Sequence, residues 1–143
     1  MTEVGTQSED RRLTAGEVHR RLVAAYGDVQ TGRLDEALKL IDADVIDHRG
    51  GSQGDFVGRD AWRDKWALIA TTDLAKVSMT IEENLEVGET SVNRYTVRGI
   101  DSASGRPYEV AGMDMVKVRH GRVVEHWTFL DAAAIRHQVS RVR

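Results

Sequence analysis

Two side chains in the C-terminal part of the sequence, Asp114 and His126, have the chemistry of a proton acceptor and a proton donor. They lie in two alternating apolar segments that are separated only by the dipeptide His120-Gly121. Segments joined by so short a turn form antiparallel strands, so Asp114 is expected roughly opposite His126 or Thr128. An aspartate and a histidine at this distance can act as an acid–base pair; the alternative is a structural hydrogen bond in the core.

The strand face that carries Asp114 is otherwise apolar. A two-residue period places Asp114 on the same face as Val110, Gly112, Val116 and Val118. A carboxylate on such a face must be hydrogen-bonded, paired with a charge, or kept partly protonated by burial. In the last strand the same period predicts one face with Val124, His126, Thr128 and Leu130, and another with Val123, Glu125, Trp127 and Phe129.

Asp47 and His48 form a second polar pair, directly before the segment 49–54, whose glycines predict a flexible loop. We expect both side chains at the mouth of a pocket, and the alternative is a solvated junction. With Asp114 and His126 they could form a two-histidine, one-carboxylate metal site. The sequence has neither HxxxH nor HxE spacing to support such a site, so we predict no metal.

Three longer side chains complete the candidate binding set. Arg94 shares a strand face with Arg98, and these arginines either bind a substrate oxygen or pair with Glu109 or Asp101. Trp62 and Trp66 share one stripe of a predicted helix, which is more typical of a core than of a substrate-stacking surface. The remaining histidines are predicted at the surface: His19, His120 and His137.

The elements that position these residues follow from a change in the hydrophobic period. Thr14, with Glu17 as a capping-box partner, opens a helix that Thr31-Gly32 ends. Two more helices are predicted over 33–41 and from 58 to about 72, with a brief extended piece at 44–48 between them. The period then falls to about two and predicts strands over 76–87, 90–101, 108–119 and 122–130, and a final helix over 131–139.

Helices followed by an antiparallel meander predict an α+β domain over residues 14–143, preceded by a flexible arm over 1–13. We expect a cone-shaped α+β barrel, in which a strongly curved antiparallel or mixed sheet packs against about three N-terminal helices. Such a cone has one open mouth and holds a pocket.

The overall composition argues against nucleic acid and membrane as partners. The chain has 143 residues, 41% of them hydrophobic and 30% charged, with a formal net charge of -3 and no cysteine. This charge gives no basic footprint for nucleic acid. No apolar run approaches the roughly 20 residues of a membrane span, and the N-terminus lacks an apolar signal core. We therefore expect a cytoplasmic protein that binds neither nucleic acid nor membrane.

Several short motifs occur in a characteristic order along the chain. They are Asp47-His48, Gly58 at a helix start, Ser104-Gly105-Arg106-Pro107, Gly112-Met113-Asp114, the segment GRVVEHW over 121–127, and Asp131. This order resembles the SnoaL-like polyketide cyclase family of the nuclear-transport-factor-2-like superfamily, over about 17–138.

The resemblance implies a cofactor-free enzyme with its site inside the cone. The best-known members close a polyketide ring by aldol condensation, in which a carboxylate removes a proton alpha to a carbonyl and a donor stabilises the enolate. His126 matches the family histidine, whereas Thr128 stands where the cyclases have their catalytic aspartate. Asp114 would then serve as base and His126 as donor.

The family also supplies the remaining expectations. The substrate would be small, hydrophobic and polyketide-like, with candidate contacts from Asp47, His48, Trp62, Trp66, Arg94 and Thr128. Alternatives are a component of polyketide ring hydroxylation that acts with a reductase partner, an isomerase, or a non-catalytic ligand-binding or dimerisation module. We expect a homodimer through the outer face with Val123, Trp127 and Phe129, unless those residues pack beneath the flanks of the helices.

Overall fold

A curved sheet and four helices make up the part of the chain that the computed structural model describes, residues 12–30, 33–48, 54–71 and 77–140. The helices are α1 (Ala15–Gln30), α2 (Leu34–Leu38), α3 (Arg59–Thr71) and α4 (Ala132–Val139). The strands are β1 (Ile41–His48), β2 (Asp55–Val57), β3 (Ser78–Val87), β4 (Thr90–Ile100), β5 (Pro107–Arg119) and β6 (Arg122–Leu130).

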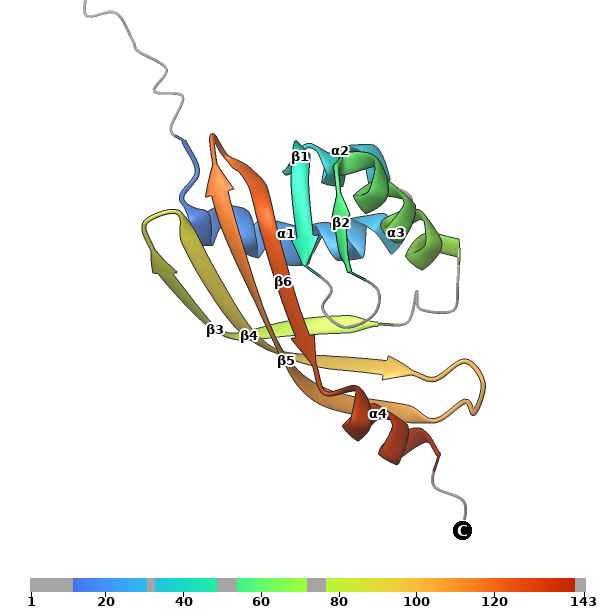
Figure 1. The fold of residues 1–143 in the computed structure, drawn as a ribbon. Coiled ribbons are helices and arrows are strands. Elements are labelled where there is room, and N and C mark those ends of the chain that lie inside the picture. The colour runs from blue at the N-terminus through green and yellow to red at the C-terminus, as the bar shows by residue number, and fades with distance from the viewer. Residues whose placement is uncertain (1–11, 31–32, 49–53, 72–76, 141–143) are drawn as a thin grey trace, which may run out of the picture.

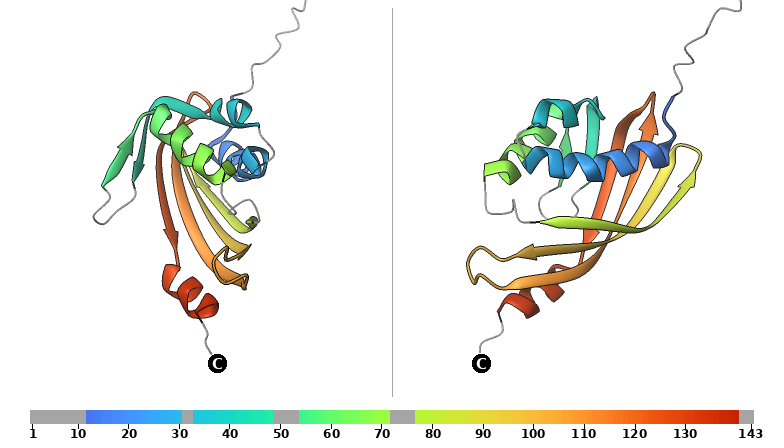
Figure 2. Two further views of the ribbon diagram at one scale, coloured as in Figure 1. Left: turned by 90° about the vertical axis from the view of Figure 1, so that its right-hand side faces the viewer. Right: turned by 180° about the vertical axis from the view of Figure 1, so that it is seen from behind.

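The six strands form one sheet in the order β2-β1-β6-β5-β4-β3. Neighbouring strands are antiparallel except β1 and β6, which run parallel. The sheet bends strongly, and α1 to α3 lie against its concave side (Figures 1 and 2). The predicted α+β class and curved mixed sheet are confirmed, but the sheet stays open rather than closing into a barrel.

The core lies between α1, α3 and the concave face of the sheet. Helix α1 begins at the predicted capping box, in which Thr14 and Glu17 exchange hydrogen bonds of 3.1 and 3.2 Å. Its apolar stripe contributes Val18 and Leu22 to the core. The other large members of this core are Leu38, Ile41, Val45, Trp62, Trp66, Val116, Val118 and Val123.

The predicted meander is confirmed to within a few residues, whereas the first half of the chain differs more. The helix expected over 33–41 ends at Leu38, and Ile41 begins β1, where it pairs with Val123. The short strand β2 was not predicted, because all three of its residues are exposed and have no alternating pattern. Most of the predicted flexible loop, 49–53, lies outside the described residues, as does 1–11 of the predicted arm. Leu13, the end of that arm, packs against the core.

A β-bulge in β6 changes which residues face the core. Lys117 pairs with Glu125 and Val118 with Val123, so β6 has one extra residue, Val124, at this point. Strict alternation had placed Val123 on the outer face, and this prediction is wrong, since Val123 is fully buried. Beyond the bulge the predicted alternation holds, with His126 buried and Phe129 exposed.

Among the described residues, no helix is both long and apolar enough to cross a membrane.

Candidate functional site

Three adjacent strands bring Asp47, Asp114 and His126 together on the concave face of the sheet. In the strand register Asp47 of β1 lies beside His126 of β6, and Asp114 of β5 lies beside Thr128. All three charged or titratable side chains are buried. The predicted proximity of Asp114 to His126 and Thr128 is therefore present, and Asp47 joins them.

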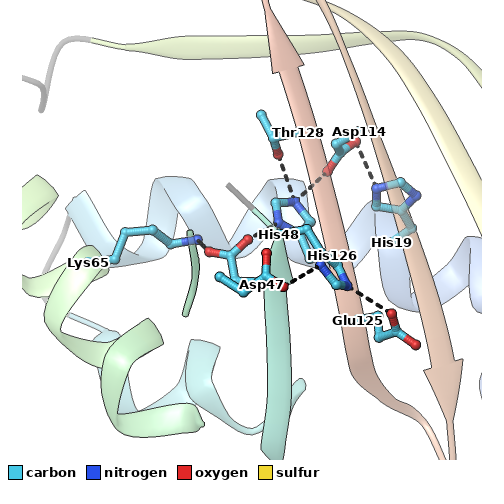
Figure 3. A network of polar contacts seen from close by, with 9 residues as sticks. His19, Asp47, His48, Lys65, Asp114, Glu125, His126 and Thr128 are labelled. Carbon is cyan, nitrogen blue, oxygen red and sulfur yellow. Dashed lines mark hydrogen bonds and ion pairs between the residues drawn. The ribbon is translucent and has the colours of Figure 1, made fainter. Parts of the chain in front are cut away.

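His126 is the centre of this group because each of its ring nitrogens meets a carboxylate (Figure 3). Nδ1 lies 2.8 Å from Oδ1 of Asp47, and Nε2 lies 3.2 Å from Oδ2 of Asp114. The hydroxyl of Thr128 is also 3.0 Å from Nε2. A ring nitrogen donates to a carboxylate only when it carries a hydrogen, so each of these two contacts is a hydrogen bond only where the nitrogen that faces the carboxylate is an N–H.

Lys65 on α3 supplies a cation on the other side of Asp47. Its Nζ donates to Oδ2 of Asp47 at 2.8 Å and lies 3.6 Å from the centre of the Trp62 ring. Burial opposes ionisation of Asp47, but the hydrogen bond from His126 and the charge of Lys65 outweigh it and lower the pKa of this carboxyl. Asp47 is therefore a carboxylate at neutral pH. Sequence reasoning missed Lys65, because a lysine on a helix usually faces solvent.

Asp114 has a second histidine beside it, His19 of α1. Nε2 of His19 lies 2.8 Å from Oδ1 of Asp114 (Figure 3). Burial opposes ionisation of Asp114, yet His126 and His19 together hold the pKa of its carboxyl below the usual value. Of the three states expected for this residue, these contacts favour hydrogen bonding over protonation by burial.

The prediction that His19 lies at the surface is wrong, since this side chain is completely buried. The helical period contained the signal: Ala15, His19, Leu22 and Tyr26 are spaced at i, i+4, i+7 and i+11, on one face of α1. A polar residue inside an apolar stripe needs a buried partner, and here the partner is Asp114.

A cavity of about 280 Å³ opens beside this polar group. Asp114, His126, Thr128 and Lys65 are on its wall. The rest of the wall is largely apolar and aromatic, with Trp62, Trp66, Tyr95 and Tyr108 among its members. The two tryptophans, which the sequence favours as core residues, thus both pack in the core and line the cavity. The polar group occupies one part of an otherwise apolar pocket, as in many small-molecule sites.

Three of the predicted contacts are not on the cavity wall: Asp47, His48 and Arg94. Asp47 contacts His126 and Lys65, which do line the cavity. His48 follows Asp47 in β1 and so points to the opposite face, where it contacts Asp55 at 3.1 Å and Glu125 at 2.9 Å. It also stacks on Trp127, with 4.6 Å between ring centres. Arg94 is exposed and lies 3.5 Å from Glu83, consistent with the ion-pairing alternative.

Within the described ranges, no three histidine or acidic side chains are arranged to hold a metal ion.

Comparison with protein families gives one match, to the SnoaL-like domain, over residues 19–126. The matched region includes His19, Asp47, Lys65, Asp114 and His126. Among proteins with curated functions, none matches the sequence significantly.

Solved structures with the same fold include several named as candidate polyketide cyclases. IdmH of Streptomyces antibioticus superposes with a TM-score of 0.75 at 25% identity, covering 90% of this chain and 100% of that one. A SnoaL-like protein of Jannaschia sp. CCS1 gives a TM-score of 0.75 at 16% identity, covering 90% and 93%. A third, from Pseudomonas putida KT2440, gives 0.69 at 17% identity, covering 90% and 99%.

Proposed function

Because the chain belongs to the SnoaL-like domain family, we propose that it is a cofactor-independent enzyme that performs acid–base chemistry on a small, hydrophobic, polyketide-like substrate. The observation that carries the proposal is the buried Asp47–His126–Asp114 array, in which His126 and Asp114 lie on the wall of an apolar cavity. The structural relatives named as candidate polyketide cyclases support the substrate class.

Asp114 is the proposed base. Its lowered pKa keeps it ionised at neutral pH, and it lies on the cavity wall, where it can take a proton from a carbon alpha to a substrate carbonyl. The negative charge that develops on the carbonyl oxygen needs donors in a dry site. His126 and Lys65 line the same cavity and carry N–H groups for that purpose.

In a ring closure, the enolate carbon would attack a second carbonyl carbon of the same substrate and form a carbon–carbon bond. The oxygen of that carbonyl would then recover the proton from Asp114 directly, or from His126, to which Asp114 would in turn pass the alpha proton, so that the protein returns to its starting state. Thr128 lacks the acidity to replace the aspartate of the cyclases. The proposal therefore commits to removal of the alpha proton, the step that aldol cyclisation shares with ketone isomerisation.

The open cavity favours this proposal over a module that only binds or dimerises. A module would fill the centre of the cone with side chains, whereas here a space of about 280 Å³ adjoins the charged group. Two carboxylates, a lysine and two histidines are costly to bury, so a purely structural core would contain apolar residues instead.

The test is exchange of alpha protons for deuterium in 2-tetralone, followed by NMR in D₂O with the whole chain. We expect catalysed exchange that falls by at least about 100-fold in Asp114→Asn and in His126→Ala. Glu109→Gln is the matched control, since Glu109 lies on the same strand but is exposed and pairs with Arg98. Equal rates in wild type and both site variants would contradict the proposal.

We also propose that the chain forms a homodimer through the convex face of the sheet. Met113 and Phe129 are direct cross-strand neighbours there and are 47% and 71% exposed. They lie in a shallow apolar hollow that also includes Val92 and Met115. Of the residues expected at this interface, Val123 lies in the core and Trp127 is stacked on His48, which leaves Phe129.

A further inference from the structure

We propose that His19 is a positioning residue of the site: a neutral imidazole that turns its Nε2–H toward Asp114, with this tautomer set by a directional chain of hydrogen bonds through Arg20, Asn84 and Ser91. The catalytic consequence of this arrangement rests on the proposed function. The tautomer itself follows from the contacts alone.

The series of hydrogen bonds begins at the surface with Arg20, an exposed residue of α1. A guanidinium can only donate, and Nη1 of Arg20 donates to Oδ1 of Asn84 at 3.0 Å. This contact settles the orientation of the Asn84 amide, because the oxygen must face the arginine. The amide nitrogen of Asn84 consequently faces inward.

The orientation of the Asn84 amide in turn fixes the role of the Ser91 hydroxyl. Its Nδ2 donates to Oγ of Ser91 at 2.8 Å and to Oδ1 of Asn93 at 2.7 Å. The oxygen of Ser91 is therefore an acceptor toward Asn84. Its own O–H needs another partner, and the acceptor in reach among the described residues is Nδ1 of His19, at 2.8 Å.

The protonation of His19 follows from this last contact. A ring nitrogen that accepts from a hydroxyl carries no hydrogen, so the single N–H of the neutral ring lies at Nε2. An imidazolium would instead donate from Nδ1 and leave the hydroxyl of Ser91 without an acceptor. Both residues are completely buried, and an unpaired buried hydroxyl destabilises the fold.

Nε2 of His19 is 2.8 Å from Oδ1 of Asp114, but the N–H points off the line of a good hydrogen bond, so the contact is mainly electrostatic. Each oxygen of Asp114 thus faces a different histidine, Oδ1 facing His19 and Oδ2 facing His126. The third titratable group near Asp114 is Tyr95 of β4, whose own pKa is raised by burial and by the charge of Asp114. His19 is absent from the cavity wall, so it acts only through Asp114.

The first experiment is ¹⁵N NMR of the histidine-labelled full chain, which distinguishes protonated from bare ring nitrogens without a substrate. We expect His19 to show a protonated Nε2 and a bare Nδ1 at pH 7. Ser91→Ala removes the hydroxyl that fixes the tautomer and should convert His19 to a mixture of tautomers. A doubly protonated His19, or a protonated Nδ1 in wild type, overturns the proposal.

The second experiment measures the effect on Asp114 by ¹³C NMR titration of its carboxyl. His19→Leu removes the polar N–H beside Oδ1 of the ionised carboxylate, so the midpoint of the Asp114 titration should move upward by roughly one pH unit. His19→Gln places an amide N–H where Nε2 stood and should restore most of the difference. If His19→Leu does not fold, Ser91→Ala serves as the gentler variant and should give a smaller upward shift. Equal midpoints in the folded variants and wild type overturn the proposal.

These readouts separate failure of the inference from failure of the proposed function. If wild type does not catalyse exchange but the tautomer and the carboxyl midpoint behave as expected, then the function is wrong and the role of His19 stands. If exchange is catalysed, its acidic limb should shift in the same direction as the carboxyl midpoint in His19→Leu and recover in His19→Gln. Exchange profiles that are identical in all three proteins contradict the positioning role.

Discussion

Oδ1 of Asp47 lies 2.8 Å from Nδ1 of His126, and the same two residues stand side by side in the register of the parallel strands β1 and β6. The backbone pairing and the side-chain contact therefore reinforce one another. Because Lys65 holds the second oxygen of Asp47, the carboxylate connects helix α3 to the last strand through a single buried side chain. Four variants test what this arrangement and its surroundings do.

Asp47→Asn removes the carboxylate that faces Nδ1 of His126. We expect the rate of alpha-proton exchange to fall by about 100-fold, because the imidazole of His126 is then less well oriented. Asp44→Asn is the matched control, since Asp44 lies on the same strand but is exposed. An exchange rate for Asp47→Asn equal to that of the control would remove Asp47 from the mechanism.

Lys65→Met leaves the buried carboxylate of Asp47 without its ammonium partner. Loss of one partner of a fully buried pair typically costs roughly 3–5 kcal/mol, and partial exposure of Lys65 reduces the expected loss of unfolding free energy to about 2 kcal/mol. Urea denaturation measures it. Lys39→Met is the control, because Lys39 and Glu36 form an exposed pair and its loss should change stability by less than about 0.5 kcal/mol. Similar losses of unfolding free energy in both variants would show that the Asp47–Lys65 pair contributes no more to stability than an exposed ion pair.

His48 should make stability depend on pH at the outer face of the sheet. Hydrogen bonding to Glu125 and Asp55 raises the pKa of His48. The contribution of His48 to the free energy of unfolding is therefore complete below the ordinary pKa of about 6.5, and it is lost as the pH rises through the raised pKa. The free energy of unfolding of wild type should exceed that of His48→Gln by about 0.5 kcal/mol at pH 6, and this difference should vanish by about pH 9. Urea denaturation at several pH values measures it, with His137→Gln on α4 as the control. A difference that is constant with pH would mean that packing on Trp127 accounts for the effect.

Phe129→Glu places a charge in the proposed interface between two copies of the chain. Light scattering coupled to size exclusion should give the mass of two chains for wild type and of one chain for the variant, because a desolvated glutamate disfavours the contact. Val87→Glu, at an equally exposed position on β3, should remain a dimer. A monomeric wild type would contradict the dimer proposal.

The antiparallel half of the fold could be predicted because its signals are local. Short turns fix which strands are neighbours, and a glycine at the turn permits the left-handed backbone found at Gly121, where φ is 74°. The proximity of Asp114 to His126 follows from counting outward from that turn. The helical period also places His19 on the apolar face of α1, so its burial could have been predicted. It was missed because an isolated histidine is usually exposed.

The remainder of the site depends on contacts that no local pattern contains. Asp47 meets His126 across 79 residues, through a parallel pairing whose existence requires the whole chain to be folded. The extra residue at Val124 turns Val123 to the face opposite the one that strict alternation predicts. This could not be predicted, because a bulge has no reliable sequence signal. Lys65 faces inward because α3 packs over β1, which composition alone does not reveal.

The position of β6 between β1 and β5 has a consequence for synthesis on the ribosome. Until residues 122–130 emerge, the hairpin β1–β2 and the meander β3–β5 share no strand. Each then has one more unpaired edge than in the complete sheet, at β1 and at β5. Asp47 and Asp114 belong to separate halves at that stage, and the His126 imidazole that lies between them has not yet been added. A nascent chain stalled before β6 should therefore be open to proteases and chaperones, and the site should form in a single late step.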